Sequence, residues 1–128
     1  MPSWSEYKTV AHERGALAME MFVVESKPAA TPEKMQDILP RHLAYQMEME
    51  AAGKLFLAGP LSDPSGNEMS GGGMIIYRAS SIEEARQLAE ADPMHSEGGR
   101  TFKVRAWLVN EGSLQIGLSL SNQSLTIG

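Results

Sequence analysis

Apolar residues form four short runs that are typical of β-strands. Leu17–Glu25 is apolar on both of its faces, which favours a central strand over a half-exposed one. Lys54–Ala58 is a shorter run that ends at Gly59-Pro60, and Met74–Ala79 is the third. The fourth, Phe102–Val109, alternates between apolar and polar positions. The pattern therefore predicts four strands.

A segment of helical periodicity follows the first run, and we expect a helix over Pro32–Ala52. Thr31 can cap its start, and Pro32 suits the first helical position, where the backbone N–H has no helical partner. Pro40 lies inside the pattern and predicts a kink or a break near that point. Gly53 predicts the end of the helix. The apolar positions predict a buried stripe made of Met35, Ile38, Leu39, Leu43 and Met47.

A second helix is expected over Ser81–Ala91. Ser81 with Glu84 forms a capping-box pattern, and Asp92-Pro93 ends the helix because the residue before a proline avoids the helical conformation. Its apolar face consists of Ile82, Ala85, Leu88 and Ala89. Between the second and third runs, Leu61–Gly73 is rich in Pro, Asp, Asn, Ser and Gly, which predicts a long turn.

Both ends of the chain extend beyond this set of elements. Residues 1–16 form an N-terminal extension in which Ser3 and Glu6 indicate a short capped helix that ends near Gly15, with disorder as the alternative. After the turn at Asn110-Glu111-Gly112, the segment Leu114–Ser121 alternates between apolar and polar residues. We expect a fifth strand that forms a hairpin with Phe102–Val109 and buries its leucines and isoleucine, on this subunit or a partner.

The predicted order β-α-β-β-α-β is that of a ferredoxin-like α+β fold, here with an extra C-terminal strand. Such a fold places both helices on one face of an antiparallel sheet, within a single domain that we expect over residues 17–128. Apolar residues on both sheet faces then require a second cover. We expect a homodimer formed by the face that carries Phe22 and Trp107.

Composition excludes several classes of function. The chain has 128 residues with a net charge of −5, so the phosphates of a nucleic acid would be repelled. No apolar run approaches the roughly 20 residues that span a bilayer, and charged residues interrupt the start where a secretory signal would need an apolar core. The absence of cysteine excludes disulfides and thiolate metal sites. We expect a soluble, cytoplasmic protein.

Two residues are candidates for acid–base chemistry. His42 stands at the edge of the predicted stripe, and imidazole moves protons readily near neutral pH because its ordinary pKa is roughly 6.5. Asp92 lies at the C-terminal end of a helix, which disfavours a negative charge, so a second role such as orienting a histidine is indicated. The alternatives are a structural histidine at a helix edge and an ordinary Asp-Pro helix stop.

Other motifs carry less chemistry. Gly71-Gly72-Gly73 precedes a strand and lacks a following Gly-Lys-Ser/Thr, so it is not a phosphate-binding loop. His12, His42 and His95 lie in separate segments without a metal-ligand spacing, and no metal site is expected. The nine methionines fit core packing. Neither a cysteine nor a serine in a nucleophile elbow is available, which leaves acid–base chemistry or none.

These residues resemble the YCII-related proteins over about residues 18 to 110. The matching pieces, in order, are His42-Leu43, Ala52-Gly53-Lys54-Leu55, Ala58-Gly59-Pro60-Leu61, Ser81-Ile82-Glu83-Glu84-Ala85, Ala91-Asp92-Pro93-Met94 and Val104-Arg105-Ala106-Trp107. The resemblance implies a ferredoxin-like fold that pairs into a dimeric α+β barrel, with His42 and Asp92 as the active-site pair. Family members often carry an arginine three positions before the histidine, where this chain has Leu39 and places Arg41 beside the histidine instead.

The resemblance also implies a function. Some family members are similar to enzymes that remove chloride or rearrange lactones by proton transfer without a cofactor. We therefore expect a lyase or isomerase that acts on a small ring compound, with His42 moving the proton and Asp92 orienting its imidazole. A non-catalytic dimeric module that binds a small ligand is the alternative. The candidate substrate-binding residues are Arg41, Gly59, Pro60, Asp63, Tyr77 and Arg105.

Overall fold

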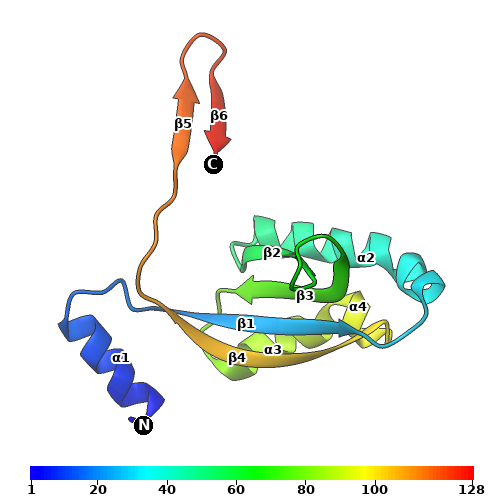
Figure 1. Cartoon of the computed structure of the whole chain (residues 1–128), viewed down its shortest axis with the longest axis horizontal. Coiled ribbons are helices and arrows are strands. Elements are labelled where there is room, and N and C mark those ends of the chain that lie inside the picture. The colour runs from blue at the N-terminus through cyan, green and yellow to red at the C-terminus, as the bar shows by residue number, and fades with distance from the viewer. The chain divides into compact units, whose positions relative to one another are not determined.

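The computed structural model describes residues 1–128 and contains a four-stranded sheet with its helices, followed by a separate β-hairpin (Figure 1). The elements are α1 (Trp4–Glu13), β1 (Met19–Pro28), α2 (Pro32–Ala51), β2 (Leu55–Ser62), β3 (Met69–Tyr77), α3 (Ile82–Ala91), α4 (Pro93–Ser96), β4 (Arg100–Val109), β5 (Ile116–Ser119) and β6 (Ser124–Ile127). The chain divides into two compact units, Glu20–Trp107 and the two terminal segments Met1–Met19 with Leu108–Gly128. The predicted β-α-β-β-α-β order is confirmed within the first unit.

The sheet has the strand order β2-β3-β1-β4. β3 pairs antiparallel with both of its neighbours, so that Ile75 lies opposite Val24 on β1 and opposite Ala58 on β2. β1 is therefore an interior strand, as its two apolar faces predicted. The mixed α+β architecture with an antiparallel, ferredoxin-like sheet is confirmed.

Helix α2 begins and ends where its capping residues predict. The Thr31 hydroxyl accepts a hydrogen bond from the backbone N–H of Lys34 at 3.2 Å, and Pro32 is the first helical residue. The helix continues as one element across Pro40, so the chain is not split there. Gly53 follows the last turn with a φ of +74°, a left-handed conformation that glycine adopts without steric cost.

The buried face of α2 is rotated from the predicted stripe. Ile38 is buried as predicted, but Leu39, Leu43 and Met47 are 40%, 49% and 71% exposed in this chain. The core-facing positions between Ile38 and Met49 are instead occupied by the half-buried His42 and Tyr45. Polar side chains can face the core here because each has a hydrogen-bond partner, which removes the main cost of burial.

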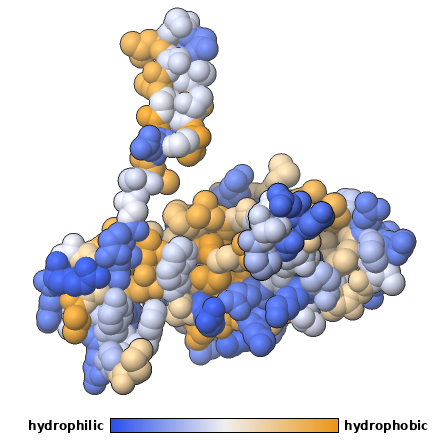
Figure 2. Space-filling model, in the orientation of Figure 1, coloured by the Kyte–Doolittle hydropathy of each residue, from blue (hydrophilic) through white to orange (hydrophobic).

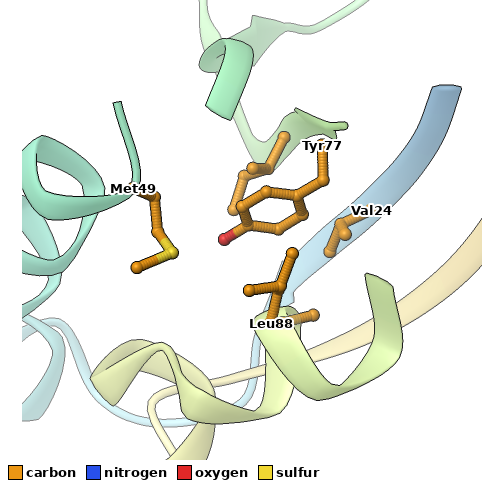
Figure 3. Packing of buried hydrophobic residues seen from close by; sticks show 6 residues of the cluster. Val24, Met49, Tyr77 and Leu88 are labelled. Carbon is orange, nitrogen blue, oxygen red and sulfur yellow. The ribbon is translucent and has the colours of Figure 1, made fainter. Parts of the chain in front are cut away.

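The hydrophobic core lies between the sheet and helices α2 and α3. Val24 from β1 and Ile75 and Tyr77 from β3 pack with Met49 of α2 and with Leu88 and Ala89 of α3. Figure 3 shows the Tyr77 ring beside Val24 and Leu88, with its hydroxyl oxygen on the side of Met49. Because Val24 lies opposite Ile75 on one face of the sheet, both helices cover the same face.

Strands β2 and β3 are longer than predicted, and the turn between them is correspondingly short. β2 runs through Gly59-Pro60, which an edge strand tolerates because the missing N–H of proline need not point into the sheet. β3 begins at Met69 and includes the three consecutive glycines. The turn is tightened by Asp63, whose carboxylate accepts hydrogen bonds from the backbone N–H of Ser65 at 3.0 Å and of Gly66 at 3.2 Å.

The sheet face away from the helices differs in composition from the prediction. Phe22 lies opposite Tyr77 and so shares the helix-covered face, where it is 2% exposed. Trp107 lies on the other face, because Phe102 and Val104 pack against the core and side chains alternate along β4. Placing Phe22 and Trp107 on one face was therefore wrong. The face away from the helices carries Trp107 with Val23 and its cross-strand partner Ile76.

The terminal segments confirm one prediction and contradict another. Ser3 and Glu6 form the predicted capping box at the start of α1. The segment after β4, however, does not pair with β4. β5 pairs with β6 in a separate two-stranded sheet, and its large apolar side chains are exposed rather than buried (Figure 2). None of the helices combines the length and apolar character needed to cross a membrane.

Candidate active site

A histidine and a carboxylate meet where α2 passes the junction of α3 and α4. The Nδ1 atom of His42 lies 2.8 Å from Oδ1 and 2.8 Å from Oδ2 of Asp92. The His42 side chain is 15% exposed, and Asp92 is fully buried. An ionised carboxylate only accepts hydrogen bonds, so Nδ1 carries the proton and donates it. Nε2 has no hydrogen-bond partner in the chain and is available to a ligand.

Asp92 is held in place by the turn between two helices. Asp92 has an extended backbone and lies between the end of α3 and the start of α4. Its Oδ1 atom caps α4 by accepting a hydrogen bond from the backbone N–H of Met94 at 2.9 Å. Pro93 takes the first helical position of α4. An aspartate that was disfavoured at the end of α3 is thus favoured at the start of α4. This local reason fixes the carboxylate against His42.

Tyr45, one turn after His42, links α2 to α3. Its hydroxyl donates a hydrogen bond to the backbone carbonyl of Leu88 at 2.7 Å. Burial, with the nearby negative charge of Asp92 as a smaller cause, raises the pKa of Tyr45 to about 12, so the hydroxyl stays protonated as a donor. The contact holds α2 at a fixed distance from the helix that precedes Asp92.

His42 lines a cavity of about 490 Å³ between α2 and the glycine-containing part of β3. Most of the lining is apolar, and the polar side chains are few. They are His42, Gln46, Ser26 and Arg100. A mostly apolar pocket of a few hundred cubic ångströms with a small number of polar groups is typical of a small-molecule site.

A second hydrogen-bond network borders the same cavity. The ring of His95 on α4 bonds through Nδ1 to the carbonyl of Ala89 at 2.8 Å and through Nε2 to the hydroxyl of Ser26 at 2.8 Å. The Ser26 hydroxyl also accepts a hydrogen bond from Nε of Arg100 at 2.8 Å. Since a carbonyl can only accept, Nδ1 of His95 carries a proton, and the Ser26 hydroxyl donates to Nε2 when the ring is neutral.

Burial favours that neutral form of His95. It lowers the pKa of the imidazole, and it outweighs the opposing effects of the Ala89 carbonyl and the Asp92 charge. The electrostatic effects of the His42 ring and of Arg100 on the His95 imidazole act in the same direction as burial. The order of donors is therefore Arg100 to Ser26, Ser26 to His95, and His95 to Ala89.

Two of the six predicted substrate-binding residues line the cavity and four do not. Gly59 and Pro60 of β2 form part of its wall. Arg41 instead forms a two-pronged ion pair with Glu97, with Nη2 2.6 Å from Oε1, and this pair holds the pKa of the Glu97 carboxyl below its usual value. Arg105 pairs with Glu25. Both arginines are outside the cavity lining.

Asp63 and Tyr77 are also outside the cavity. Hydrogen bonds within the turn, first that from the Ser65 hydroxyl, lower the pKa of Asp63. Tyr77 is fully buried in the core, and its hydroxyl has no hydrogen-bond partner in the chain. Burial raises the pKa of Tyr77. Asp63 is thus a turn-forming residue and Tyr77 a core residue.

Sequence reasoning missed Ser26, His95 and Arg100 as neighbours. They lie on β1, α4 and β4, so only the fold brings them together. The position of His95, three residues after Asp92 and within the short helix that Asp92 caps, was the one local signal. No three or more histidine, aspartate or glutamate side chains are grouped in a way that could hold a metal ion.

Comparisons with known proteins place the chain in a known group. Residues 19–108 match the model of the YCII-related domain, a range that nearly coincides with the compact unit Glu20–Trp107. The uncharacterised protein YjpA of Bacillus subtilis is 28% identical over 72 residues, which cover 56% of this chain and 78% of YjpA. The crystallised dehydrochlorinase TftG of Burkholderia phenoliruptrix, which acts on 5-chloro-2-hydroxyhydroquinone, is 26% identical with a TM-score of 0.52. That match covers 68% of this chain and 92% of TftG, whose structure is a complex with 2,5-dihydroxybenzoquinone.

Proposed function

The chain belongs to the YCII-related domain family, and from this membership and the geometry of the cavity we propose an enzyme that transforms a small molecule by acid–base catalysis. His42 is the proposed base and acid, and Asp92 the residue that orients it. One observation carries the proposal. Asp92 is bonded to Nδ1 of His42, and His42 lines the cavity. The unpaired Nε2 of His42 is therefore available to a substrate. This is the arrangement of a base with its orienting carboxylate.

The proposed reaction is an elimination or isomerisation. His42 removes a proton from the substrate through Nε2, and the electron pair of the broken bond moves into the ring. In an elimination, a leaving group such as chloride departs with its own bonding pair, so the net loss is one molecule of acid. Asp92 stabilises the imidazolium that forms between the two steps. No oxidant or reductant is consumed. In an elimination the proton leaves His42 to solvent, and in an isomerisation His42 returns it to another atom of the substrate.

The proposed substrate is a small ring compound. The cavity volume of about 490 Å³ lies within the range of small-molecule pockets, and its apolar lining suits a ring. Similarity to TftG, named for a dehydrochlorinase and crystallised with a quinone, supports this class. The compound 5-chloro-2-hydroxyhydroquinone is therefore the first to test.

The test follows chloride release from that compound and from a panel of chlorinated hydroxyhydroquinones. We expect turnover by the natural chain and a loss of about 100-fold or more in His42→Gln, since general acid–base catalysis contributes about 10²- to 10⁴-fold. Arg86→Gln, on the exposed side of α3, is the control that keeps its rate. Equal rates in the natural chain and His42→Gln would contradict the proposal. Tight binding of these compounds without turnover would favour the alternative, a ligand-binding module.

We further propose that two copies of the chain pair through the sheet face away from the helices, as in a dimeric α+β barrel. That face carries the aromatic Trp107, which is 42% exposed, beside the apolar pair Val23 and Ile76, which is already buried in the single chain. Leu57, opposite Ile76 on β2, is 56% exposed. The exposed Trp107 and Leu57 on this one sheet face favour a second copy of the chain as their cover.

A further inference from the structure

The cavity contains one permanent cation, Arg100, that forms no ion pair. Arg100, at the start of β4, has no acidic side chain within ion-pair distance. Arg14, Arg41 and Arg105, by contrast, each pair with a glutamate that lies outside the cavity lining. No aspartate or glutamate lines the cavity, although the chain has 16 acidic residues and a net charge of −5. The cavity lining therefore carries a cation and no acidic side chain. The negative charge of Asp92, which also acts on Arg100, lies behind the lining and is already bonded to His42.

Arg100 is held rigidly by neutral acceptors. Nε donates to the Ser26 hydroxyl at 2.8 Å, and Nη2 donates to the carbonyls of Ser26 at 2.9 Å and of Gly71. Nη1 has no partner in the chain. A guanidinium remains protonated in proteins even though burial lowers the pKa of Arg100. The N–H groups of Nη1 are thus free to donate hydrogen bonds to a ligand.

The surrounding residues maintain this arrangement. Burial favours the neutral form of His95, whose Nδ1 donates to the carbonyl of Ala89. Its Nε2 therefore accepts the hydrogen bond from the Ser26 hydroxyl, and the lone pairs of the Ser26 oxygen remain available to Arg100. Gly73 passes close to the guanidinium, since a Cβ added there would lie 3.8 Å from Nη2. The absence of a side chain at Gly73 leaves space beside the charge.

From these observations we propose that Arg100 is a specificity-determining residue that binds an anionic oxygen of the ligand, so that the cavity selects small ring compounds carrying an ionised hydroxyl or carboxylate. A partly buried cation without an ion-pair partner is costly, and an anionic ligand lowers that cost. Charge-assisted hydrogen bonds from a fixed guanidinium then fix the orientation of the ring. The inference deepens the proposed function, because it assigns the substrate class to the cavity of His42, and it rests on that function.

The experiment measures ligand binding by calorimetry at neutral pH. The probe is 2,5-dihydroxybenzoquinone, whose hydroxyls are conjugated with the carbonyls and therefore ionise as a carboxylic acid does. The neutral match is 2,5-dimethoxybenzoquinone, which has the same ring and no acidic proton. Benzoate and 4-nitrophenolate test whether a carboxylate and a phenolate are also accepted. We expect at least one anion to bind with a Kd below about 1 mM and about tenfold more tightly than the neutral quinone.

Variants identify the residue responsible. Arg100→Gln should weaken the anion about tenfold or more and change the neutral quinone by less than about threefold, since it removes a charged donor and keeps polar ones. Arg100→Lys keeps the charge and should retain part of the affinity, which separates loss of charge from loss of fold. Arg86→Gln should change neither Kd. Failure of all three anions to bind, or equal weakening of the anion and the neutral quinone in Arg100→Gln, would overturn the proposal.

The result is distinguishable from a failure of the proposed function. His42→Gln tests catalysis through turnover, while Arg100→Gln tests selection through Kd for a charged against a neutral ligand. If anion selectivity depends on Arg100 and no turnover is detected, the proposed anion subsite is supported and the proposed enzymatic function is rejected. If turnover depends on His42 and anion binding is unchanged in Arg100→Gln, the proposed anion subsite is rejected and the proposed enzymatic function is supported.

Discussion

Both carboxylate oxygens of Asp92 lie 2.8 Å from the same nitrogen, Nδ1 of His42. The shared contact fixes the ring orientation and its tautomer, and Asp92 is itself fixed as the cap of α4 through Met94. A substitution at Asp92 therefore tests the orientation of the His42 ring without removing the imidazole that carries the proton.

Asp92→Asn should lower kcat by about 10- to 1,000-fold with a smaller change in KM, because an amide keeps the shape and cannot stabilise an imidazolium. Asparagine also caps helices well, so α4 should remain folded. Asp63→Asn, a carboxylate in the turn outside the cavity, is the matched control and should keep its kcat. A normal kcat in Asp92→Asn would mean that the carboxylate only caps the helix.

Tyr77→Phe should leave activity unchanged and keep or raise stability. The Tyr77 hydroxyl is buried without a hydrogen-bond partner in the chain, and such a group costs about 1–3 kcal/mol. Its removal should raise the free energy of unfolding by up to about 1 kcal/mol after a small void is subtracted, or roughly 4 °C in Tm. Thermal unfolding and kcat measure the two effects. A large fall in kcat would return Tyr77 to the active site.

Local sequence signals predicted the helix boundaries well. Thr31 caps α2, Ser81 accepts the N–H of Glu84 at the start of α3, and Ser3 caps α1, because capping depends on residues only three positions apart. Glu84, however, returns its carboxylate to Ser80 rather than to Ser81. The pairing of His42 with Asp92 was reached through the resemblance, and the structure confirms the contact but not its role.

The remaining errors share a physical cause, which is that long-range packing decides between locally equivalent choices. Apolar spacing on α2 allowed two adjacent stripes, and the partner of His42 on another helix selected the one that sequence analysis did not choose. Alternation in 114–121 fits any strand partner, and β5 pairs with β6 instead of β4. Ser26 and Arg100 are 74 residues apart, beyond the reach of any spacing rule.

The buried, neutral His95 should make the fold less stable as the pH falls below about 6.5. Burial sets its folded pKa below the unfolded value, so the unfolded chain binds the proton more tightly. The stabilisation is complete above the unfolded pKa and is lost as the pH falls through the folded pKa. Between pH 5.5 and 7.5, the Tm of the natural chain should rise with pH, and His95→Gln should flatten that slope. His12→Gln, at an exposed position of α1, should retain it.

The proposed dimer should depend on Trp107. Trp107→Glu places a charge among the apolar residues of the sheet face and should shift the mass in solution toward the monomer at micromolar concentrations. Arg86→Glu, at an exposed position of α3 on the helix-covered side of the sheet, is the control for charge alone. Sedimentation equilibrium measures both. A natural chain that is monomeric at these concentrations would contradict the dimer.

The C-terminal hairpin should contribute to the same assembly. Its cross-strand pairs Ile116 with Ile127 and Leu118 with Leu125 share one face, while Ser119 with Ser124 lies on the other. The four apolar side chains are 62% to 75% exposed. An isolated two-stranded hairpin is only marginally stable in water, so an apolar face of this kind requires a cover, and we expect a second copy of the chain to supply it.

Neighbouring residues on opposite faces of that hairpin provide a matched test. Leu118→Glu should raise the Kd of dimerisation about tenfold or more, since burying one leucine contributes about 1.5–3 kcal/mol and an added charge opposes burial. Ser119→Glu adds the same charge one residue later on the polar face and should leave the Kd within about threefold. Sedimentation velocity over a concentration series measures both variants. Equal Kd values for Leu118→Glu and the natural chain would show that the apolar face of the hairpin takes no part in pairing the two copies, because a buried leucine cannot be exchanged for a glutamate without cost.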